Sequence, residues 1–352
     1  MENYTRDEKN IYNTDDATQP RPDIYDDNSP LNYVEEYEKI QRQTHEAPNH
    51  KPKRRKKSKF KKFLAKLLLL LVGLVCAALL VGWLLSFTLP AKTTFLIMAT
   101  DQDGTRTDTL MYGVFDKKDK DITLVSIPRD TYVTVSDDTY DLMNEEYPQP
   151  GSKSMKINSV HHFGGEKYGT DMLLEQVESL LDTKIDFYAK INFKAFRYII
   201  DSVGGIDFYV PQNMEYHDPL QNLNISLSEG QQHLNGEQAE QLVRYRSGYA
   251  NADLGRVDVQ QQFMKAFISQ TLSKGTILSN PMTFVNLILD KQYIDTNVNV
   301  FDIVSYAFVI GGIDTANIET NTLPGKAAYA RGQSVYKLDE TKTCELLESI
   351  MQ

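Results

Sequence analysis

The sequence predicts one α/β domain with a layered sheet, preceded by a single membrane-spanning helix. Two observations carry this prediction. A stretch near residue 80 is apolar and uncharged for longer than a soluble core element needs, and strand-like runs alternate with helical patterns over about 260 residues after it. The sequence shows no internal repeat.

The membrane helix is predicted at Leu67–Leu89, which contains no charged residue. A bilayer span needs roughly 20 such residues. Basic residues crowd the preceding stretch, Lys51–Lys62, so the positive-inside rule places the N-terminus in the cytoplasm. The alternatives are a cleaved signal peptide and a buried core helix, but the apolar run is long and lies far from Met1.

Charge divides the chain into three parts. Residues 1–50 carry 5 basic and 12 acidic side chains, residues 51–89 carry 10 basic and none acidic, and 23 basic and 36 acidic ones follow. We therefore predict a disordered cytoplasmic tail at 1–62, a signal anchor at 63–89 and an extracellular domain at 90–352. A domain this acidic is a poor nucleic-acid binder. Cys76 and Cys344 lie in different compartments and predict no disulfide.

Three strands open the domain, at Thr93–Thr100, Thr109–Phe115 and Ile122–Ile127. If they run up, down and up, the end of the first, the start of the second and the end of the third share one edge. Asp101, Asp108 and Arg129 would then meet there.

Helices and a further strand follow. Apolar spacing predicts helices over 171–181, with Thr170 as N-cap, over 192–203, from a capping box at Asn235–Gln238 to about Tyr245, and over 253–273, with a strand at 206–210. Mixed helix and strand follow residue 280. The apolar faces of these helices are expected to pack in the hydrophobic core.

Arginines gather between the last two of these helices. Arg244 and Arg246 lie where a helix pattern ends, so an unwinding end could aim both into one cleft. Arg256 and Gln260 share a helix face, with Asp253 as an N-cap or a partner of Arg256. Guanidinium groups suit phosphate or carboxylate ligands. The alternative is that they form ordinary surface ion pairs.

The paired carboxylates Asp101 and Asp108 flank a short turn and suit Mg²⁺, which leaves positions for water and phosphate. The alternative is a pair of turn-capping aspartates. His161 and His162 are adjacent, which suits packing or hydrogen bonding better than joint metal ligation.

Together these features resemble the LytR-CpsA-Psr family of cell-envelope polymer ligases. The resemblance covers nearly all of 93–340, and its specificity lies in the order of short motifs. They are Arg106-Thr-Asp108-Thr-Leu-Met, Ser126-Ile-Pro-Arg129-Asp130, Lys156-Ile-Asn158-Ser, Phe163-Gly-Gly165, Asn192-Phe, Asp201-Ser-Val-Gly-Gly-Ile206, Leu234-Asn-Gly-Glu-Gln238 and the Arg-Tyr-Arg…Asp…Gly-Arg…Gln-Gln segment.

The resemblance implies a three-layer α/β/α domain with a central mixed sheet and an apolar tunnel for a polyprenyl lipid. It implies that Arg129, Arg244, Arg246, Arg256 and Gln260 grip a pyrophosphate, with Arg106, Lys156, Asn158 and Asp253 in support. It implies that Asp101 and Asp108, with Arg129 beside them, form the catalytic group, and that the aspartates bind Mg²⁺ (or Mn²⁺) or activate the acceptor hydroxyl.

The implied reaction moves an anionic glycopolymer, such as teichoic acid or capsule, from undecaprenyl pyrophosphate to peptidoglycan at the membrane of a Gram-positive bacterium. Two other functions stay open: a non-catalytic sensor of lipid pyrophosphate and a polyprenyl pyrophosphatase. The chain departs from the family pattern at Ala99, at Val259 and in the short loop between Asp101 and Asp108.

Overall fold

The computed structural model describes residues 38–39, 42, 59–101, 104–147, 152–219, 223–249, 253–271, 286, 293–310, 313 and 315–352, with side chains from 61 in the first long helix and from 255 in the helix that starts at 253. The predicted cytoplasmic tail therefore lies almost wholly outside the described residues.

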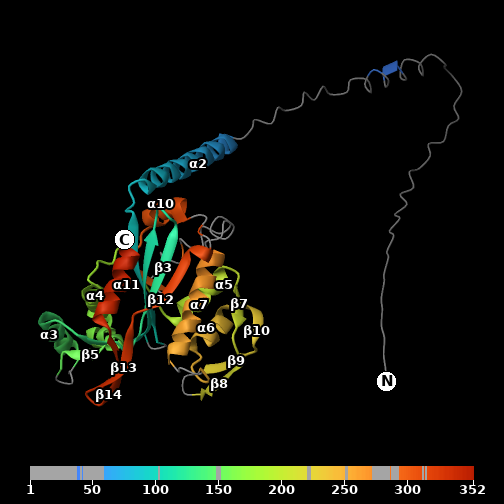
Figure 1. The fold of residues 1–352 in the computed structure, drawn as a ribbon. Coiled ribbons are helices and arrows are strands. Elements are labelled where there is room, and N and C mark those ends of the chain that lie inside the picture. The colour runs from blue at the N-terminus through green and yellow to red at the C-terminus, as the bar shows by residue number, and fades with distance from the viewer. Residues whose placement is uncertain are drawn as a thin grey trace, which may run out of the picture. The chain divides into compact units, whose positions relative to one another are not determined.

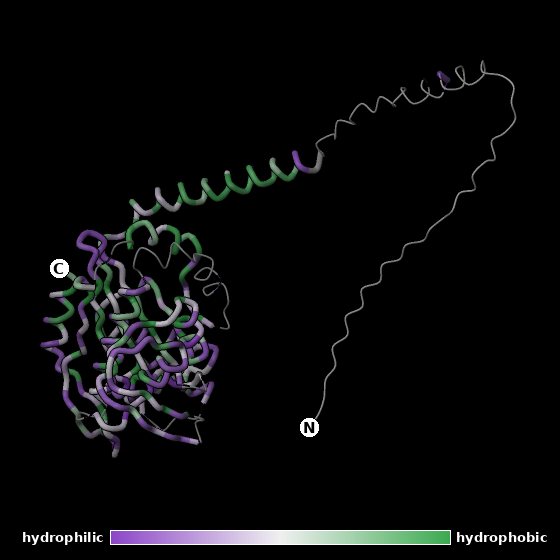
Figure 2. The backbone as a smooth tube through the Cα atoms, turned by 90° about the vertical axis from the view of Figure 1, so that its right-hand side faces the viewer, coloured by the Kyte–Doolittle hydropathy of each residue, from purple (hydrophilic) through white to green (hydrophobic). Residues whose placement is uncertain are grey.

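The apolar stretch forms one helix, α2 (Lys59–Ser86). An 18-residue window within Lys61–Ser86 has a mean hydropathy of 2.8, and the helix is long and apolar enough to cross a membrane. Figure 2 shows this helix as a nearly continuous hydrophobic tube. The helix ends three residues before the predicted limit, because Ser86 and Thr88 turn their hydroxyls back to backbone carbonyls at Trp83 and Leu85.

The domain is built on a six-stranded mixed sheet (Figure 1), in the order β11-β6-β1-β2-β3-β12. The three opening strands run up, down and up as the sequence predicted, because each pairs antiparallel with the next. β6 joins β1 in parallel and β12 joins β3 in parallel. The strands are β1 (Lys92–Thr100), β2 (Thr107–Asp116), β3 (Asp121–Ile127), β6 (Phe187–Ile191), β11 (Ile294–Thr296) and β12 (Ile318–Thr322).

Helices cover both faces of this sheet, so the fold is mixed α/β with three layers. On one face, α4 (Ile157–Leu181) and α11 (Glu340–Met351) pack on alternate side chains of the central strands, such as Leu96 and Tyr112. On the other face, α7 (Asp253–Thr271) and α10 (Val300–Ile310) pack on the intervening ones, such as Met111 and Leu124. Successive side chains of a strand point to opposite faces of the sheet, so each strand contributes to both of these cores.

A smaller cluster stands beside the sheet. It has its own core around Ile200, Leu242 and Phe263, which α7 shares with two short antiparallel strand pairs, β7–β10 and β8–β9. Its elements are α5 (Phe193–Ser202), β7 (Ile206–Val210), β8 (Met214–Asp218), β9 (Leu223–Leu227), β10 (Gly230–Leu234) and α6 (Gly236–Arg244).

Short elements surround the end of the sheet at which β1 and β3 stop. They are β4 (Tyr132–Thr134), α3 (Asp137–Glu146), β5 (Ser154–Lys156), β13 (Gly325–Ala330) and β14 (Gln333–Leu338). The 3-10 turn Thr315–Asn317 lies at the opposite end, where it leads into β12. The backbone N–H of Tyr336 in β14 donates to the Asp130 carbonyl at 2.8 Å, which ties the β13–β14 hairpin to the end of β3.

One predicted helix boundary is wrong. The helix expected at 171–181 begins at Ile157 and bends at Gly165, whose φ is 62°. Thr170 is not an N-cap; it is buried inside α4 and donates its hydroxyl to Asp295. Glycines explain both facts. Gly164 packs against Gly169, where a Cβ on Gly164 would lie 2.6 Å from the Gly169 Cα, so these glycines allow the close approach at the bend of α4.

Candidate functional site

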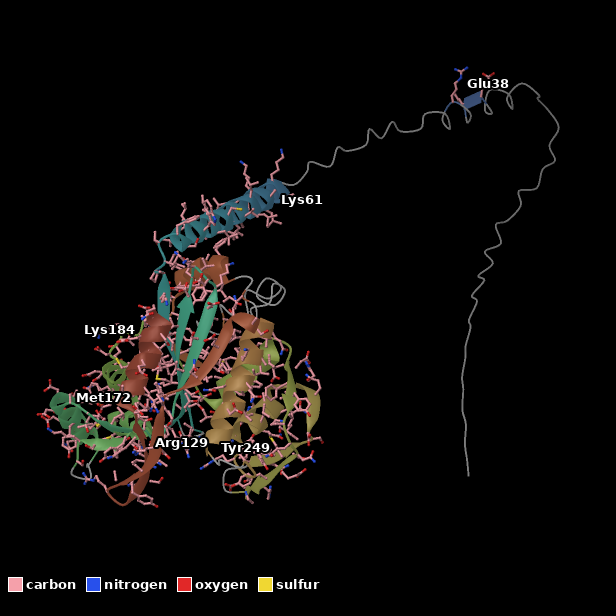
Figure 3. The ribbon with its side chains drawn as sticks, in the orientation of Figure 1. Glu38, Lys61, Arg129, Met172, Lys184 and Tyr249 are labelled. Atoms are coloured by element: carbon pink, nitrogen blue, oxygen red, sulfur yellow. The ribbon has the colours of Figure 1, made fainter. Side chains whose placement is uncertain are left out.

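The ends of the three opening strands form one wall of a cavity, as their predicted order required. Asp101 follows β1, Asp108 lies near the start of β2 and Arg129 follows β3. All three side chains line a cavity of about 420 Å³. Figure 3 places Arg129 at the end of the domain away from α10.

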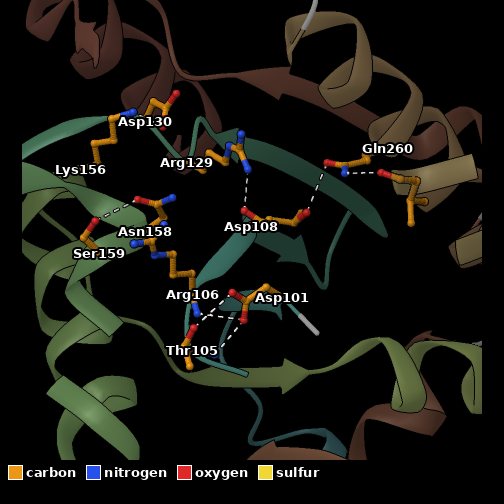
Figure 4. A network of polar contacts seen from close by, with 12 residues as sticks. Asp101, Thr105, Arg106, Asp108, Arg129, Asp130, Lys156, Asn158, Ser159 and Gln260 are labelled. Carbon is orange, nitrogen blue, oxygen red and sulfur yellow. Dashed lines mark hydrogen bonds and ion pairs between the residues drawn. The ribbon is translucent and has the colours of Figure 1, made fainter. Parts of the chain in front are cut away.

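A β-bulge directs Asp108 into this cavity. Ala99 pairs with Thr109 and Thr100 pairs with Thr107, so Asp108 has no partner residue across the ladder. Such an extra residue bends the strand and re-aims its side chain. The Arg129 guanidinium then donates from Nη1 to Asp108 Oδ1 at 2.7 Å (Figure 4).

Asp101 has a different role in the structure, that of a turn cap. Its Oδ1 accepts the backbone N–H groups of Thr105 at 2.8 Å and Arg106 at 3.1 Å, and its Oδ2 accepts the Thr105 hydroxyl at 3.2 Å. The side chain thus lines the cavity while its carboxylate organises the loop that leads to Asp108 (Figure 4). The alternative of a turn-capping aspartate is therefore correct for Asp101. A further role in binding a metal or activating the acceptor stays open.

The arginine segment forms the opposite wall. The capping box at Asn235 and Gln238 starts α6 as predicted, and the helix ends at Arg244. The next residue, Tyr245, is extended, so Arg244 and Arg246 both reach the cavity even though a continuous helix would separate them. The convergence expected from an unwinding helix end is present.

Arg244 is held in place from two sides. It donates to Glu240 at 2.8 Å, one helical turn earlier, and its guanidinium carbon lies 4.7 Å from the centre of the Phe193 ring. Glu240 is buried and also accepts from Arg197. Sequence reasoning missed Glu240 and Phe193, although the i,i+4 spacing of Glu240 and Arg244 was a readable signal.

Arg256 and Gln260 approach from α7 and line the same cavity on one helix face, as predicted. Arg256 is only 5% exposed. The Gln260 amide donates to the Val243 carbonyl at 2.9 Å and accepts the Thr109 hydroxyl at 3.4 Å. It therefore links the end of α6 to β2. The side chain of Asp253 lies outside the described residues.

Apolar side chains line the rest of the cavity. They come from the sheet and from α5 and α7, and include Ile97, Met111, Phe196, Phe263 and Met264. The cavity thus pairs four arginines and two carboxylates with an apolar wall. Of the positions that depart from the family pattern, Ala99 lines this cavity, whereas Val259 is buried in the core between α6 and α7.

The three remaining supporting residues lie elsewhere. Arg106, Lys156 and Asn158 line a second pocket of about 620 Å³, which shares Asp108 and Arg129 with the first. Lys156 donates to Asp130 at 2.9 Å, and Asn158 is buried. They therefore lie on the side of the Arg129–Asp108 pair that is opposite the cavity wall formed by Arg244, Arg246 and Arg256.

The His161 ring contacts the loop between Asp101 and Asp108. Its Nδ1 lies 3.0 Å from the Thr105 carbonyl and its Nε2 lies 3.4 Å from Lys190 Nζ. A lysine ammonium can only donate, so the ring is neutral, accepts at Nε2 and donates from Nδ1 to Thr105. Burial, followed by the charge of Lys190, lowers the pKa of His161 below its usual value. His162 stacks on Tyr147, and both histidines have the packing and hydrogen-bonding roles predicted for them.

Asp101 and Asp108 are the residues that could hold a divalent cation. Among the residues that the structure describes, no group of three or more His, Cys, Asp or Glu side chains could enclose a metal. Two carboxylates beside an arginine-lined cavity do fit Mg²⁺, which commonly takes one or two protein oxygens and completes its shell with water and phosphate.

The fold and the cavity define a class of protein: a mixed α/β domain behind one apolar helix, with an arginine- and carboxylate-lined pocket at the strand ends. The chain belongs to the LytR-CpsA-Psr family, because residues 43–351 match the family model described as LytR_cpsA_psr.

Named relatives agree with that membership. The chain is 31% identical over 248 residues to the polyisoprenyl-teichoic acid–peptidoglycan teichoic acid transferase TagV of Bacillus subtilis, a match that covers 70% of the chain and 58% of TagV. It is 29% identical over 266 residues to TagU of the same organism, covering 73% and 76%. The crystal structure of B. subtilis TagV superposes with a TM-score of 0.61 and 25% identity over 75% of the chain and 97% of that structure.

Proposed function

We propose that this protein is a membrane-anchored transferase that moves an anionic glycopolymer from a polyprenyl pyrophosphate to peptidoglycan. One observation carries the proposal: a single cavity joins four arginines and two carboxylates to an apolar wall. A lipid pyrophosphate has the same two parts, a dense negative charge and a long apolar chain. The relatives TagV and TagU are named as teichoic acid transferases that act on peptidoglycan, which supports the same assignment.

The arginines would bind the donor's phosphates. Arg244 and Arg256 are held in rigid helical positions, and planar guanidinium groups bind phosphate oxygens in pairs. Arg129 would move part of its interaction from Asp108 to the donor phosphate when the donor binds. Charge stabilisation of this kind is the main demand of phosphoryl transfer, which needs little covalent help.

Asp108 is the better candidate for the base, because it lines both pockets whereas Asp101 lines only the arginine-walled one. In the proposed reaction an acceptor hydroxyl forms a bond to the phosphorus that carries the polymer. The bond from that phosphorus to the bridging oxygen breaks, lipid phosphate leaves, and Asp108 takes the hydroxyl proton. Mg²⁺ held by the two aspartates would supply further charge stabilisation.

The test is a transfer assay with the full chain in detergent micelles, lipid-linked polymer, peptidoglycan and Mg²⁺. We expect a covalent polymer–peptidoglycan product, and we expect the double variant Arg244→Ala/Arg246→Ala to lose it. Arg197→Ala is the matched control, because it removes an arginine that contacts the same Glu240 but does not line the cavity. Release of free polymer phosphate without product would identify a hydrolase. Binding of the donor without turnover would identify a sensor.

A further inference from the structure

The second pocket has the character of a carbohydrate site. It is about 620 Å³, within the range of roughly 300–1,000 Å³ typical of small-ligand sites. Its walls are mostly polar, with Arg106, Lys156, Arg331 and Gln333 around two aromatic residues, Tyr132 and Phe163. The first pocket has a large apolar wall, so the two differ in the chemistry that they can accept.

The Arg129–Asp108 pair stands between the two pockets, since these two residues line both. Figure 4 shows the arrangement: Lys156 and Asn158 lie to one side of the pair and Gln260 lies to the other. A donor phosphate bound by the arginines would therefore lie between the first pocket and the second pocket.

The walls of the second pocket are fixed to the reaction centre by backbone hydrogen bonds. Asn158 N–H donates to the Arg129 carbonyl at 3.2 Å, and Ile157 N–H donates to the Thr131 carbonyl at 2.8 Å. The β13–β14 hairpin is tied to Asp130 through Tyr336. A ligand in this pocket would thus be held at a defined position relative to Asp108.

The hairpin tip carries an unusual residue. Arg331 and Gly332 form a two-residue turn with φ values of 51° and 76° between the paired residues Ala330 and Gln333. Turns with two positive φ values favour Asn, Asp or Gly, and another residue type in this conformation costs about 1 kcal/mol or more. Arg331 lines the pocket despite that cost, which indicates that its side chain has a use there.

The chemistry of transfer says which ligand this pocket receives. In phosphoryl transfer the attacking and leaving oxygens lie roughly in line on opposite sides of the phosphorus. If the lipid phosphate leaves into the apolar first pocket, the acceptor must approach from the second. We infer that the second pocket is the binding groove for the acceptor glycan, with Arg331 and Gln333 as contacts to the acceptor sugars. This inference rests on the proposed function.

The reaction that the groove serves balances without another reactant. An acceptor sugar hydroxyl in the groove forms the new oxygen–phosphorus bond, the bridging phosphoanhydride bond breaks, and the hydroxyl proton passes to Asp108. Water can replace the sugar hydroxyl in the same position, so transfer to water serves as an internal measure of the donor side.

The experiment measures binding of the donor and binding of the acceptor separately, with the full chain in detergent micelles. Lipid-linked polymer is the donor, and a β-1,4-linked oligosaccharide prepared from peptidoglycan is the acceptor probe. For Arg331→Asn we expect the acceptor KM to rise about tenfold, the effect of losing one charge-assisted hydrogen bond, and for Gln333→Ala about fivefold, the effect of losing a neutral one. The donor KM and the rate of transfer to water should not change. Asn suits the turn, so Arg331→Asn should fold at least as stably as the parent.

Two residues of the same hairpin provide matched controls. Tyr329 pairs with Ser334 on the face opposite Ala330 and Gln333, and Lys326 is exposed at the base of the hairpin. Tyr329→Ala and Lys326→Asn should both keep the parent acceptor KM.

Three outcomes separate the possibilities. An unchanged acceptor KM in both groove variants would overturn the inference, while leaving the transferase assignment intact. A raised donor KM instead would place the donor's polymer in the groove and would also overturn it. If the unaltered chain makes no product from either acceptor, the proposed function itself has failed.

Discussion

At the scale of single residues, two aspartates that look equivalent in the sequence have different surroundings. Asp101 uses both carboxylate oxygens to close its own turn, whereas Asp108 sits on a bulge and bonds to Arg129. Their contributions to folding and to chemistry should therefore separate on substitution.

We predict that Asp108→Asn lowers the transfer rate by about 10² or more, the usual contribution of a general base, with little change in Tm. Asp101→Asn should lower Tm, because an amide nitrogen cannot accept the Thr105 hydroxyl, and should lower the rate less. Initial rates of product formation and thermal unfolding of both variants provide the measurement. Equal rate losses with equal Tm values would contradict this division of roles.

At the scale of elements, short-range signals located most of the parts that carry the site. The strands β1, β2 and β3 followed from apolar, β-branched runs bounded by polar residues, and the start of α6 followed from its capping box. The kink in α4 did not, because the close packing of Gly164 on Gly169 becomes visible only in three dimensions. The β13–β14 turn was missed because Arg331 is not a turn-forming residue type. The second pocket was missed with it, since its walls come from segments more than 200 residues apart.

The capping box of α6 should matter for stability because that helix carries Arg244 at its end. Asn235→Ala removes the side chain that accepts the Gln238 N–H, and the loss of an N-cap costs about 1 kcal/mol. In a domain of this size, Tm should fall by about 3 °C. Asn235→Ser keeps a capping oxygen and should restore most of the loss. Thermal unfolding followed by circular dichroism measures both, and equal Tm values for the two variants would refute the role of the cap.

His161 should make the loop between Asp101 and Asp108 sensitive to acid. Its folded-state pKa lies below the unfolded value of about 6.5, so its contribution to stability is present above that pH and is lost as pH falls toward the folded pKa. His161→Asn keeps a donor near the Thr105 carbonyl but does not titrate. The free energy of unfolding of this variant should therefore fall less between pH 7 and pH 5 than that of the parent. His162→Asn, which removes the neighbouring histidine, should follow the parent, and parallel curves for His161→Asn and the parent would rule out the effect.

At the scale of the whole molecule, the order of the chain ties the domain closely to its apolar helix. Only five residues separate the end of α2 from β1, and Leu89 and Ala91 within them accept hydrogen bonds from Lys117. At no more than about 3.6 Å per residue, this connection keeps the start of the sheet within about 20 Å of the helix end. If α2 spans the membrane, the domain works at the surface in which a lipid-linked donor is embedded.

Release from the helix should therefore cost activity only toward donors in a membrane. We predict that a protease site inserted between Phe87 and Thr88, before the two residues that accept hydrogen bonds from Lys117, allows the domain to be cut free of α2 after reconstitution into vesicles that carry the donor. Cleavage should lower the transfer rate by about 10² or more at low donor density, because tethering makes the encounter with the donor effectively intramolecular. A water-soluble donor with a short lipid should be used at equal rates before and after cleavage, which shows that the domain stays folded.

Replacing Lys61–Ser86 by an unrelated apolar helix of the same length should keep the parent rate, since only the tether matters. If cleavage leaves the rate on vesicles unchanged, the domain holds to the membrane by another part of its surface, and α2 does not supply the anchoring on which the reaction depends.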